Sequence, residues 1–322
     1  MATYKEIHGV KIQYRESDAT AVEGDVWYNA SAGKLKMFSA VGAWASGGDL
    51  NVGRLSVAAA GSQTAALYFG GQSPTVVSCE SYDGSTWTEV ANLGVALGYQ
   101  AGFGTQTAAI EAGGSPGAVV TVEKWNGASW TEVADLNVGR DGTGGCGTST
   151  AGLYIGGDSS PGTSLDSVES WDGSSWTEIT DFNTDRKSQG IGGTQTAAII
   201  AAGASYPPSA TRDETELWNG TSWTEVADVN TARHSQAGTN QGTTSYFLMI
   251  GGNSPPRRTE TEEWNGTAWT EVADIPAATN ELSGAGTASL GLTMGGRTPS
   301  PGALVTTLEW SGVATVQTVA FD

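Results

Sequence analysis

The sequence predicts an all-β fold built from tandem four-stranded units, and three observations support this prediction. Glycine accounts for 46 of the 322 residues and tryptophan for 12, whereas charged residues make up only 15%. This composition is typical of short strands and tight turns rather than of helices. A tryptophan recurs every 43–47 residues, followed in five of six copies by Thr-Glu-Val or Thr-Glu-Ile: Trp44, Trp87, Trp130, Trp176, Trp223 and Trp269. Asn-Gly or Asp-Gly precedes those five copies and indicates a hairpin turn, in which both central residues need positive φ.

Each repeat contains four strand-like segments, named a to d here. Strand a consists of small residues, as in RDGTGGCGT from Arg140, and strand b is an apolar run that ends in paired glycine, as in LYFGG (67–71). Strand c ends at an aromatic residue five positions before the repeated tryptophan, and strand d begins at that tryptophan. Four antiparallel strands in a unit of this length match one blade of a β-propeller.

The residue types suit wedge-shaped blades arranged in a ring. Small residues on strand a fit the crowded axis, and the aromatic residues of strands c and d fill the wider space between blades. The twelve tryptophans occupy six strand-d positions, five strand-c positions and Trp27. The repeated tryptophans are therefore predicted to be structural, with none left as a dedicated platform for sugar stacking.

The number of blades has two interpretations. Six repeats occupy residues 47–319, and Lys11 precedes Trp44 by the same 33 residues that separate Arg54 from Trp87. We favour seven blades, with residues 1–10 as an N-terminal arm, residues 11–46 as a degenerate blade and residues 11–322 as a single propeller domain. The alternative is a six-bladed ring with residues 1–42 as a separate anchor.

The order of an apolar strand, a Gly-Gly pair and two spaced aromatics resembles the Kelch repeat family, although the aromatics lie one residue closer together than is usual there. Within that family, the segment VEGDVWYNASAGKLKMF and the recurrent GTQTAA (104–109, 193–198) resemble Kelch-like virion proteins of tailed, mainly marine, bacteriophages. The resemblance implies a virion component, made in the host cytoplasm.

The formal net charge of −19 indicates an acidic surface that would repel phosphate backbones and anionic lipids. We therefore expect no nucleic-acid partner. The N-terminus lacks the apolar core of a signal peptide, and no apolar run reaches the roughly 20 residues of a membrane helix, so no membrane insertion is expected. Cys79 and Cys146 fall at unrelated strand positions, so we expect no disulfide between them.

No motif indicates an enzyme, a metal site or a cofactor. His8 and His234 have no metal-ligating partner at a suitable spacing, and the glycine-rich GTGG (142–145) precedes no helix. Glutamates recur before the strand-c aromatic and after the strand-d tryptophan in five repeats, whereas a catalytic pair would be unique. We interpret these glutamates as solvated or salt-bridged.

The arginines suggest a binding face. In an up-and-down blade, the loops between strands b and c and those between strands d and a emerge on one face. Arg54, Arg140, Arg186 and Arg233 open strand a, and Asp135 and Asp228 offer local partners for a structural role. Residues in or beside the variable b–c loops are further candidates for binding: Tyr206, Arg212, Arg257, Arg258 and Arg297.

Variable loops on a repeated scaffold favour a non-enzymatic binding or structural protein. The resemblance implies a tail-fibre or adsorption protein, or else a decoration protein of the head surface. A Kelch-type adaptor is the alternative from another class. The expected partners are other virion proteins, a host-surface glycan or a host-surface protein, with self-association left open.

Overall fold

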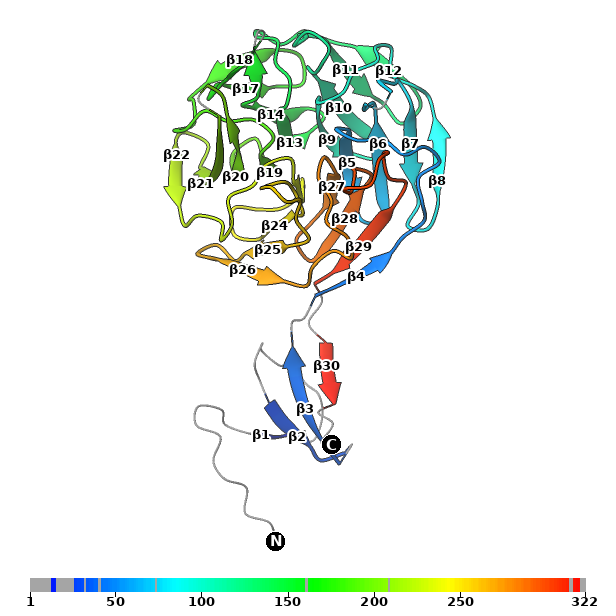
Figure 1. Cartoon of the computed structure of the whole chain (residues 1–322), viewed down its shortest axis with the longest axis vertical. Helices are drawn as coiled ribbons and strands as arrows, with labels where there is room; N and C mark the ends of the chain where they lie inside the picture. The colour runs from blue at the N-terminus through cyan, green and yellow to red at the C-terminus, as the bar shows by residue number, and fades with distance from the viewer. Residues whose placement is uncertain are drawn as a thin grey trace. The chain divides into compact units, whose positions relative to one another are not determined.

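The computed structural model describes residues 13–15, 26–31, 33–39, 42–72, 74–159, 162–207, 209–312 and 315–318. Within these ranges the regular structure consists of β-strands, with no helix. The chain divides into two compact units, one spanning Trp44–Ser311 and the other combining Met1–Ala43 with Gly312–Asp322. The larger unit is a ring of six four-stranded sheets (Figure 1). The predicted all-β propeller is thereby confirmed.

Each sheet is one blade, with its strands in the order a to d from the axis outward. Blade 1 contains β5 (Ala58–Ser62), β6 (Ala65–Phe69), β7 (Cys79–Tyr82) and β8 (Trp87–Val90). Blade 2 contains β9 (Ala101–Thr105), β10 (Ala108–Ala112), β11 (Val122–Trp125) and β12 (Trp130–Glu132). Blade 3 contains β13 (Gly144–Thr148), β14 (Ala151–Ile155), β17 (Val168–Trp171) and β18 (Trp176–Ile179).

The other three blades follow the same order. Blade 4 contains β19 (Gly190–Thr194), β20 (Ala197–Ser205), β21 (Ala210–Trp218) and β22 (Trp223–Val226). Blade 5 contains β23 (Ala237–Gly238), β24 (Phe247–Ile250), β25 (Thr261–Trp264) and β26 (Trp269–Val272). Blade 6 contains β27 (Ser283–Gly286), β28 (Leu290–Met294), β29 (Thr307–Ser311) and, from the other end of the chain, β4 (Ala43–Ser46).

The turns between strands c and d depend on a side chain as well as on glycine. In blade 1 only Gly84 of the Asp83-Gly84 pair has a positive φ, of +91°. Asp83 Oδ1 instead accepts hydrogen bonds from the backbone N–H groups of Ser85 at 2.9 Å and Thr86 at 2.8 Å. These bonds lower the pKa of Asp83 to about 2. The predicted turn is present, but the carboxylate stabilises it in place of a second positive φ.

The favoured count of seven blades is wrong, and the six-blade alternative is correct. Strand β4 pairs with β29 and completes blade 6, and the Trp44 and Trp310 rings lie 5.2 Å apart. The expected blade over residues 11–46 is not formed. Instead, β1 (Gln13–Arg15), β2 (Val26–Asn29), β3 (Lys34–Ser39) and β30 (Thr315–Thr318) make a separate sheet, with β1 parallel to β2.

The expected single domain over residues 11–322 is therefore also wrong, because strands from both ends of the chain form the second unit. The six repeats predicted over residues 47–319 correspond to blades within Trp44–Ser311. The proposed arm, residues 1–10, lies outside the described residues.

The repeated tryptophans pack between neighbouring blades. Trp223 of blade 4 joins a cluster that includes Leu153 and Ile155 of blade 3, and its indole N–H donates to the Thr180 carbonyl at 3.1 Å. Trp176 and Trp223 are each 7% exposed, whereas Trp130 and Trp44 are half-buried. Each strand-d tryptophan thus links its blade to the preceding one.

Candidate binding face

A closed ring of backbone hydrogen bonds surrounds the axis where the six strands a begin. One residue per blade takes a positive φ there: Ser56, Tyr99, Gly142, Ser188, Ser235 and Glu281. The N–H group of each donates to the carbonyl of its equivalent in the preceding blade, over 2.7–3.0 Å, and Ser56 closes the ring onto Glu281. Five of these residues carry a side chain in a conformation that glycine would adopt more easily. The ring therefore fixes several side chains at one end of the axis.

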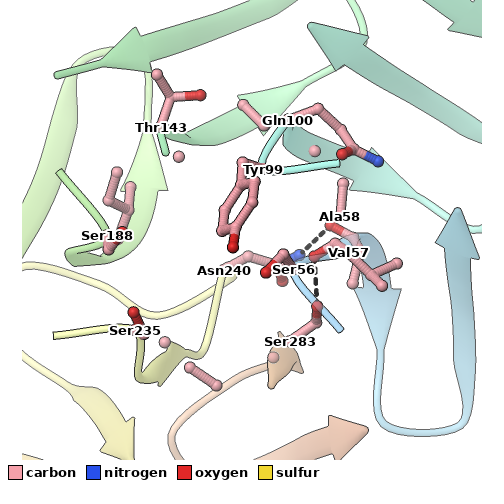
Figure 2. Close-up of a pocket in the computed structure, with 18 of the residues that line it drawn as sticks. Ser56, Val57, Ala58, Tyr99, Gln100, Thr143, Ser188, Ser235, Asn240 and Ser283 are labelled. Atoms are coloured by element: carbon pink, nitrogen blue, oxygen red, sulfur yellow. Dashed lines mark hydrogen bonds between the residues drawn. The ribbon is translucent and has the colours of Figure 1, made fainter. Parts of the chain in front are cut away.

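Below this ring, a narrow channel of about 140 Å³ follows the axis between the strands a. Figure 2 shows Tyr99, Ser188 and Ser235 around this space, each from a different blade. Asn240 donates its side-chain N–H to the Ala59 carbonyl at 3.1 Å, and the Ser283 hydroxyl donates to the Val57 carbonyl. These bonds join blades 5 and 6 to blade 1 beside the channel, whose small volume leaves little room for a large ligand.

Above the ring the channel opens into a wider hollow of about 440 Å³, here called the mouth. Side chains from five blades line it, including Tyr99, Asp141, Lys187, Tyr206, His234 and Glu281. The mouth is on the face of the b–c and d–a loops, as Ser115 and Tyr206 belong to b–c loops.

Tyr206 reaches the mouth because the b–c hairpin of blade 4 is unusually long. Strands β20 and β21 each have nine residues, and a bulge between Ala201 and Gly203 shifts their register. The tip of this hairpin also forms two hydrogen bonds with Ser164 of blade 3. Ser164 Oγ accepts from the Tyr206 N–H at 2.9 Å, and the Ser164 N–H donates to the Tyr206 carbonyl at 2.7 Å. The side chain of Tyr206 is 51% exposed. A large amphipathic ring is thus held on an anchored loop.

Charges of both signs line the mouth. Lys187 forms an ion pair with Asp158, and Glu281 forms one with Arg297 at 2.6 Å. Burial raises the pKa of Asp141, and the Asp158 carboxylate raises it further. Burial lowers the pKa of His234, and the nearby Lys187 ammonium adds to that effect. The mouth therefore offers several donors and acceptors rather than one uniform charge.

The strand-a arginines proposed for the binding face are buried. Arg140, Arg186 and Arg233 have no exposed side-chain area, and neither has Arg54. Their guanidinium groups pair with glutamates of strand c: Arg54 with Glu80 at 2.6 Å, Arg140 with Glu169 at 2.9 Å, Arg186 with Glu216, and Arg233 with Glu262 at 3.0 Å. Their assignment to a binding face is corrected to a structural role, with these glutamates as partners in place of Asp135 and Asp228.

Each of these pairs belongs to a larger set of contacts, called the clamp here. In blade 3, Arg140 Nη1 donates to the carbonyls of Gly156 at 3.0 Å and Ser167 at 2.6 Å. The guanidinium lies over the Tyr154 ring, 4.5 Å from its centroid. Glu169 also accepts from the backbone N–H of Asn137 at 2.8 Å. The clamp thus joins strands b and c to the preceding d–a loop.

The loop arginines lie nearer the surface, and three of the four have a carboxylate beside them. Arg212 pairs with Glu214 at 3.4 Å, Arg258 with Glu260 at 3.2 Å, and Arg297 with Glu281. Arg257 Nε donates to Asn280 Oδ1 at 2.6 Å. The predicted concentration of positive charge on this face is therefore largely offset. Sequence reasoning missed Lys187, Asp141 and His234, which become neighbours only when the ring closes.

Other expected features can be checked in the described part of the chain. Cys79 and Cys146 are free and buried. The described residues contain no group of three or more His, Cys, Asp or Glu side chains placed to hold a metal ion. Among the same residues, no helix is long and apolar enough to cross a membrane.

Comparison with known proteins supports the fold. No family model matches the sequence, and no curated protein matches it. Among solved structures, the chain is similar to YjhT, with a TM-score of 0.70 and 13% sequence identity over 84% of this chain and 99% of that one. At this level of identity the similarity shows the propeller fold alone.

Proposed function

We propose that this protein is a non-enzymatic binding protein of a tailed-phage virion that recognises its partner with the mouth and the surrounding b–c loops. A propeller is consistent with a protein-binding role, because its rigid blades present variable loops on one face. A tail-fibre or adsorption protein is the form of this proposal that we test first.

The observation that carries the proposal is the contrast between repeated and non-repeated positions. Every blade has a pair of aromatic residues on strands c and d, Tyr–Trp in blade 1 and Trp–Trp in the others, with ring centroids 4.8–5.5 Å apart. The positions just before the hydrogen-bonded ring instead differ in every blade: Leu55, Gly98, Asp141, Lys187, His234 and Asn280. A role in packing alone would favour similar residues at equivalent positions. Of these residues, Asp141, Lys187 and His234 line the mouth, and three side chains that differ in charge and shape suit an asymmetric partner.

Recognition fits the chemistry of the mouth better than catalysis does. Lys187 and Glu281 already have partners of opposite charge, Asp158 and Arg297. Paired groups hold their geometry and can accept or donate further hydrogen bonds, which suits recognition of a partner. The exposed ring of Tyr206 provides a large contact area at a low cost in conformational entropy.

The virion assignment is supported by the sequence resemblance to phage Kelch-like proteins. Its test is mass spectrometry of purified particles from the phage that encodes the chain. We expect the protein at a stable copy number per particle, together with tail or capsid proteins. Its absence from purified particles would exclude the virion role and favour a Kelch-type adaptor.

A second experiment separates adsorption from head decoration. Purified protein added in excess to host cells should reduce phage adsorption if it carries the receptor-binding face. A decoration protein would leave adsorption unchanged but label the capsid in immunogold micrographs.

A further inference from the structure

Blade 2 departs from the clamp in a way that points to a bound ion. Leu97 occupies the position of the arginine. Its carbonyl accepts a hydrogen bond from the Gly71 N–H, just as the Arg140 carbonyl accepts one from the Gly114 N–H. The strand-c glutamate is retained as Glu123. Glu111 occupies the position of a tyrosine in blades 1 and 3. It lies opposite Glu123 in the register of β10 and β11, as Tyr154 lies opposite Glu169 in the register of β14 and β17. Blade 2 has therefore lost the cation and gained a second carboxyl group.

Blade 6 shows the other way in which the clamp is lost. There Thr279 stands at the arginine position and Leu308 at the glutamate position, so both charges are missing together. These residues line a mostly apolar cavity of about 110 Å³ with Met294 and Leu304. Blade 6 needs no counter-ion, whereas blade 2 has two carboxyl groups without one.

The acceptors that hold the guanidinium elsewhere are still in place in blade 2. In blade 1, Arg54 donates to the Gly70 carbonyl at 2.9 Å, the Ser78 carbonyl at 2.6 Å and Glu80 Oε1 at 2.6 Å. The equivalent groups are the carbonyls of Gly113 and Thr121 and the Glu123 carboxylate. The Gly113 N–H bonds to the Thr121 carbonyl as the Gly70 N–H bonds to that of Ser78, each over 3.0 Å.

Two side chains at this position have no hydrogen bond in the described part of the chain. Glu111 is completely buried, and neither of its carboxyl oxygens has a partner. The buried hydroxyl of Thr121 is also without a partner. In blade 3 the equivalent Ser167 hydroxyl accepts from Arg140 at 3.1 Å. Buried oxygens without partners are costly, and a cation between them would remove that cost.

We propose that blade 2 binds a calcium ion in the position that the arginine guanidinium occupies in blades 1, 3, 4 and 5. The ligands are the carboxylates of Glu111 and Glu123, the carbonyls of Gly113 and Thr121, and the Thr121 hydroxyl. Glu123 already accepts three hydrogen bonds from Gly94 and Val95, over 2.9–3.1 Å, which leaves one of its lone pairs for the ion.

The chemistry of the ligands selects calcium. A divalent ion balances two carboxylates, and a set of oxygens alone disfavours zinc, copper and nickel, which prefer nitrogen or sulfur. Magnesium retains water and needs near-octahedral geometry, whereas calcium accepts irregular sets of carboxylates and carbonyls. The site contains only two acidic side chains, and two backbone carbonyls and the Thr121 hydroxyl provide the other ligands.

The first test uses calcium itself. The full-length protein is dialysed against calcium, passed through a desalting column and analysed by inductively coupled plasma mass spectrometry. We expect one calcium ion per chain and a Tm about 5 °C higher in saturating calcium than in chelator, because a ligand specific to the folded state stabilises it. A protein that retains no calcium and melts at the same temperature in chelator would overturn the proposal and leave Glu111 as a neutral, protonated acid.

The variant test rebuilds the clamp. The double substitution Leu97→Arg with Glu111→Tyr gives blade 2 the residues of blade 1, so it should fold, bind no calcium and melt independently of chelator. Glu225→Gln, an exposed glutamate of blade 4, is the matched control for binding to the acidic surface and should retain the ion. Calcium retained by the double variant, or lost equally from the Glu225 variant, would contradict a site in blade 2.

Discussion

The buried arginine of the clamp shows how one residue can stabilise a whole blade. Replacing Arg140 by Leu removes the cation and leaves Glu169 buried beside strands b and c, where it keeps only its bonds to Asn137 and Val138. Breaking a buried ion pair from one side typically costs about 3–5 kcal/mol of unfolding free energy. Urea denaturation should show this loss, while Arg140→Leu with Glu169→Leu, which removes both charges together as blade 6 does, should lose less. A single variant as stable as the wild type would show that the pair contributes little.

His234 predicts a pH dependence at the same scale. Burial and the Lys187 ammonium lower its pKa in the folded state, and Glu281 opposes this shift. As the pH falls through about 6.5, His234 therefore takes up a proton in the unfolded chain but not yet in the folded chain. This uptake favours the unfolded state, so the free energy of unfolding decreases as the pH falls below that value. Thermal melts between pH 7.5 and 5.5 should show a larger decrease for the wild type than for His234→Gln. Equal decreases would mean that His234 titrates normally in the ring.

At the scale of the strand, ring closure explains why the blade count was wrong. Trp310 has no tryptophan five residues after it, and Trp44 has no aromatic five residues before it. These two incomplete halves make one blade, with β4 alongside β29. The 33-residue spacing from Lys11 to Trp44 does not show which strands pair with one another. It therefore suggested a blade that the chain does not form. Pairing the unmatched aromatics would have predicted six blades.

The closure makes a prediction about truncation. Removing residues 1–42 leaves β4 in place, so the ring should keep its Tm within a few degrees. Removing residues 1–46 also deletes Trp44, which packs on Trp310 and donates to the Ala273 carbonyl at 2.9 Å. This second truncation also leaves β29 as an unpaired edge strand, and exposed edge strands promote aggregation. Thermal melting and size-exclusion chromatography of the two truncations check this. If both behave alike, β4 is not needed to close the ring.

At the scale of the whole molecule, the sequence predicted the framework better than the site. Hairpin signals and repeated aromatics depend on local geometry, so they identified the blades and the face that carries Tyr206 and the loop arginines. Whether a side chain is buried depends instead on neighbours that are distant in the sequence. Arg140 and Arg186 recur at equivalent positions, as the strand-c glutamates do, but the sequence does not show that an arginine and a glutamate meet in the interior of each blade. Asp141, Lys187 and His234 each lie three residues before strand a of a different blade, and only closure of the ring brings them together.

The last prediction tests the proposed binding face of the whole ring. Tyr206→Ala removes the exposed ring from the mouth, and Lys187→Ala removes its ammonium group, while both leave the six aromatic pairs intact. Thr221→Ala is the matched control, because Thr221 is exposed in the c–d turn of blade 4, on the opposite face. We also expect the double substitution Arg257→Ala with Arg258→Ala to weaken binding, through loss of planar donors beside the mouth.

Aromatic and charged residues at the centre of an interface often contribute 2 kcal/mol or more, so under the proposed adsorption role each mouth variant should weaken binding to host cells roughly 30-fold or more. The measurement is inhibition of phage adsorption by each purified variant, with the Tm used to show that the ring is still folded. Because Tyr206 is on an anchored hairpin and Lys187 lies on the same hollow, both variants should act on one partner and give similar losses. Mouth variants that compete like the wild type, together with a Thr221 variant that does not compete, would place recognition on the face of the c–d turns instead.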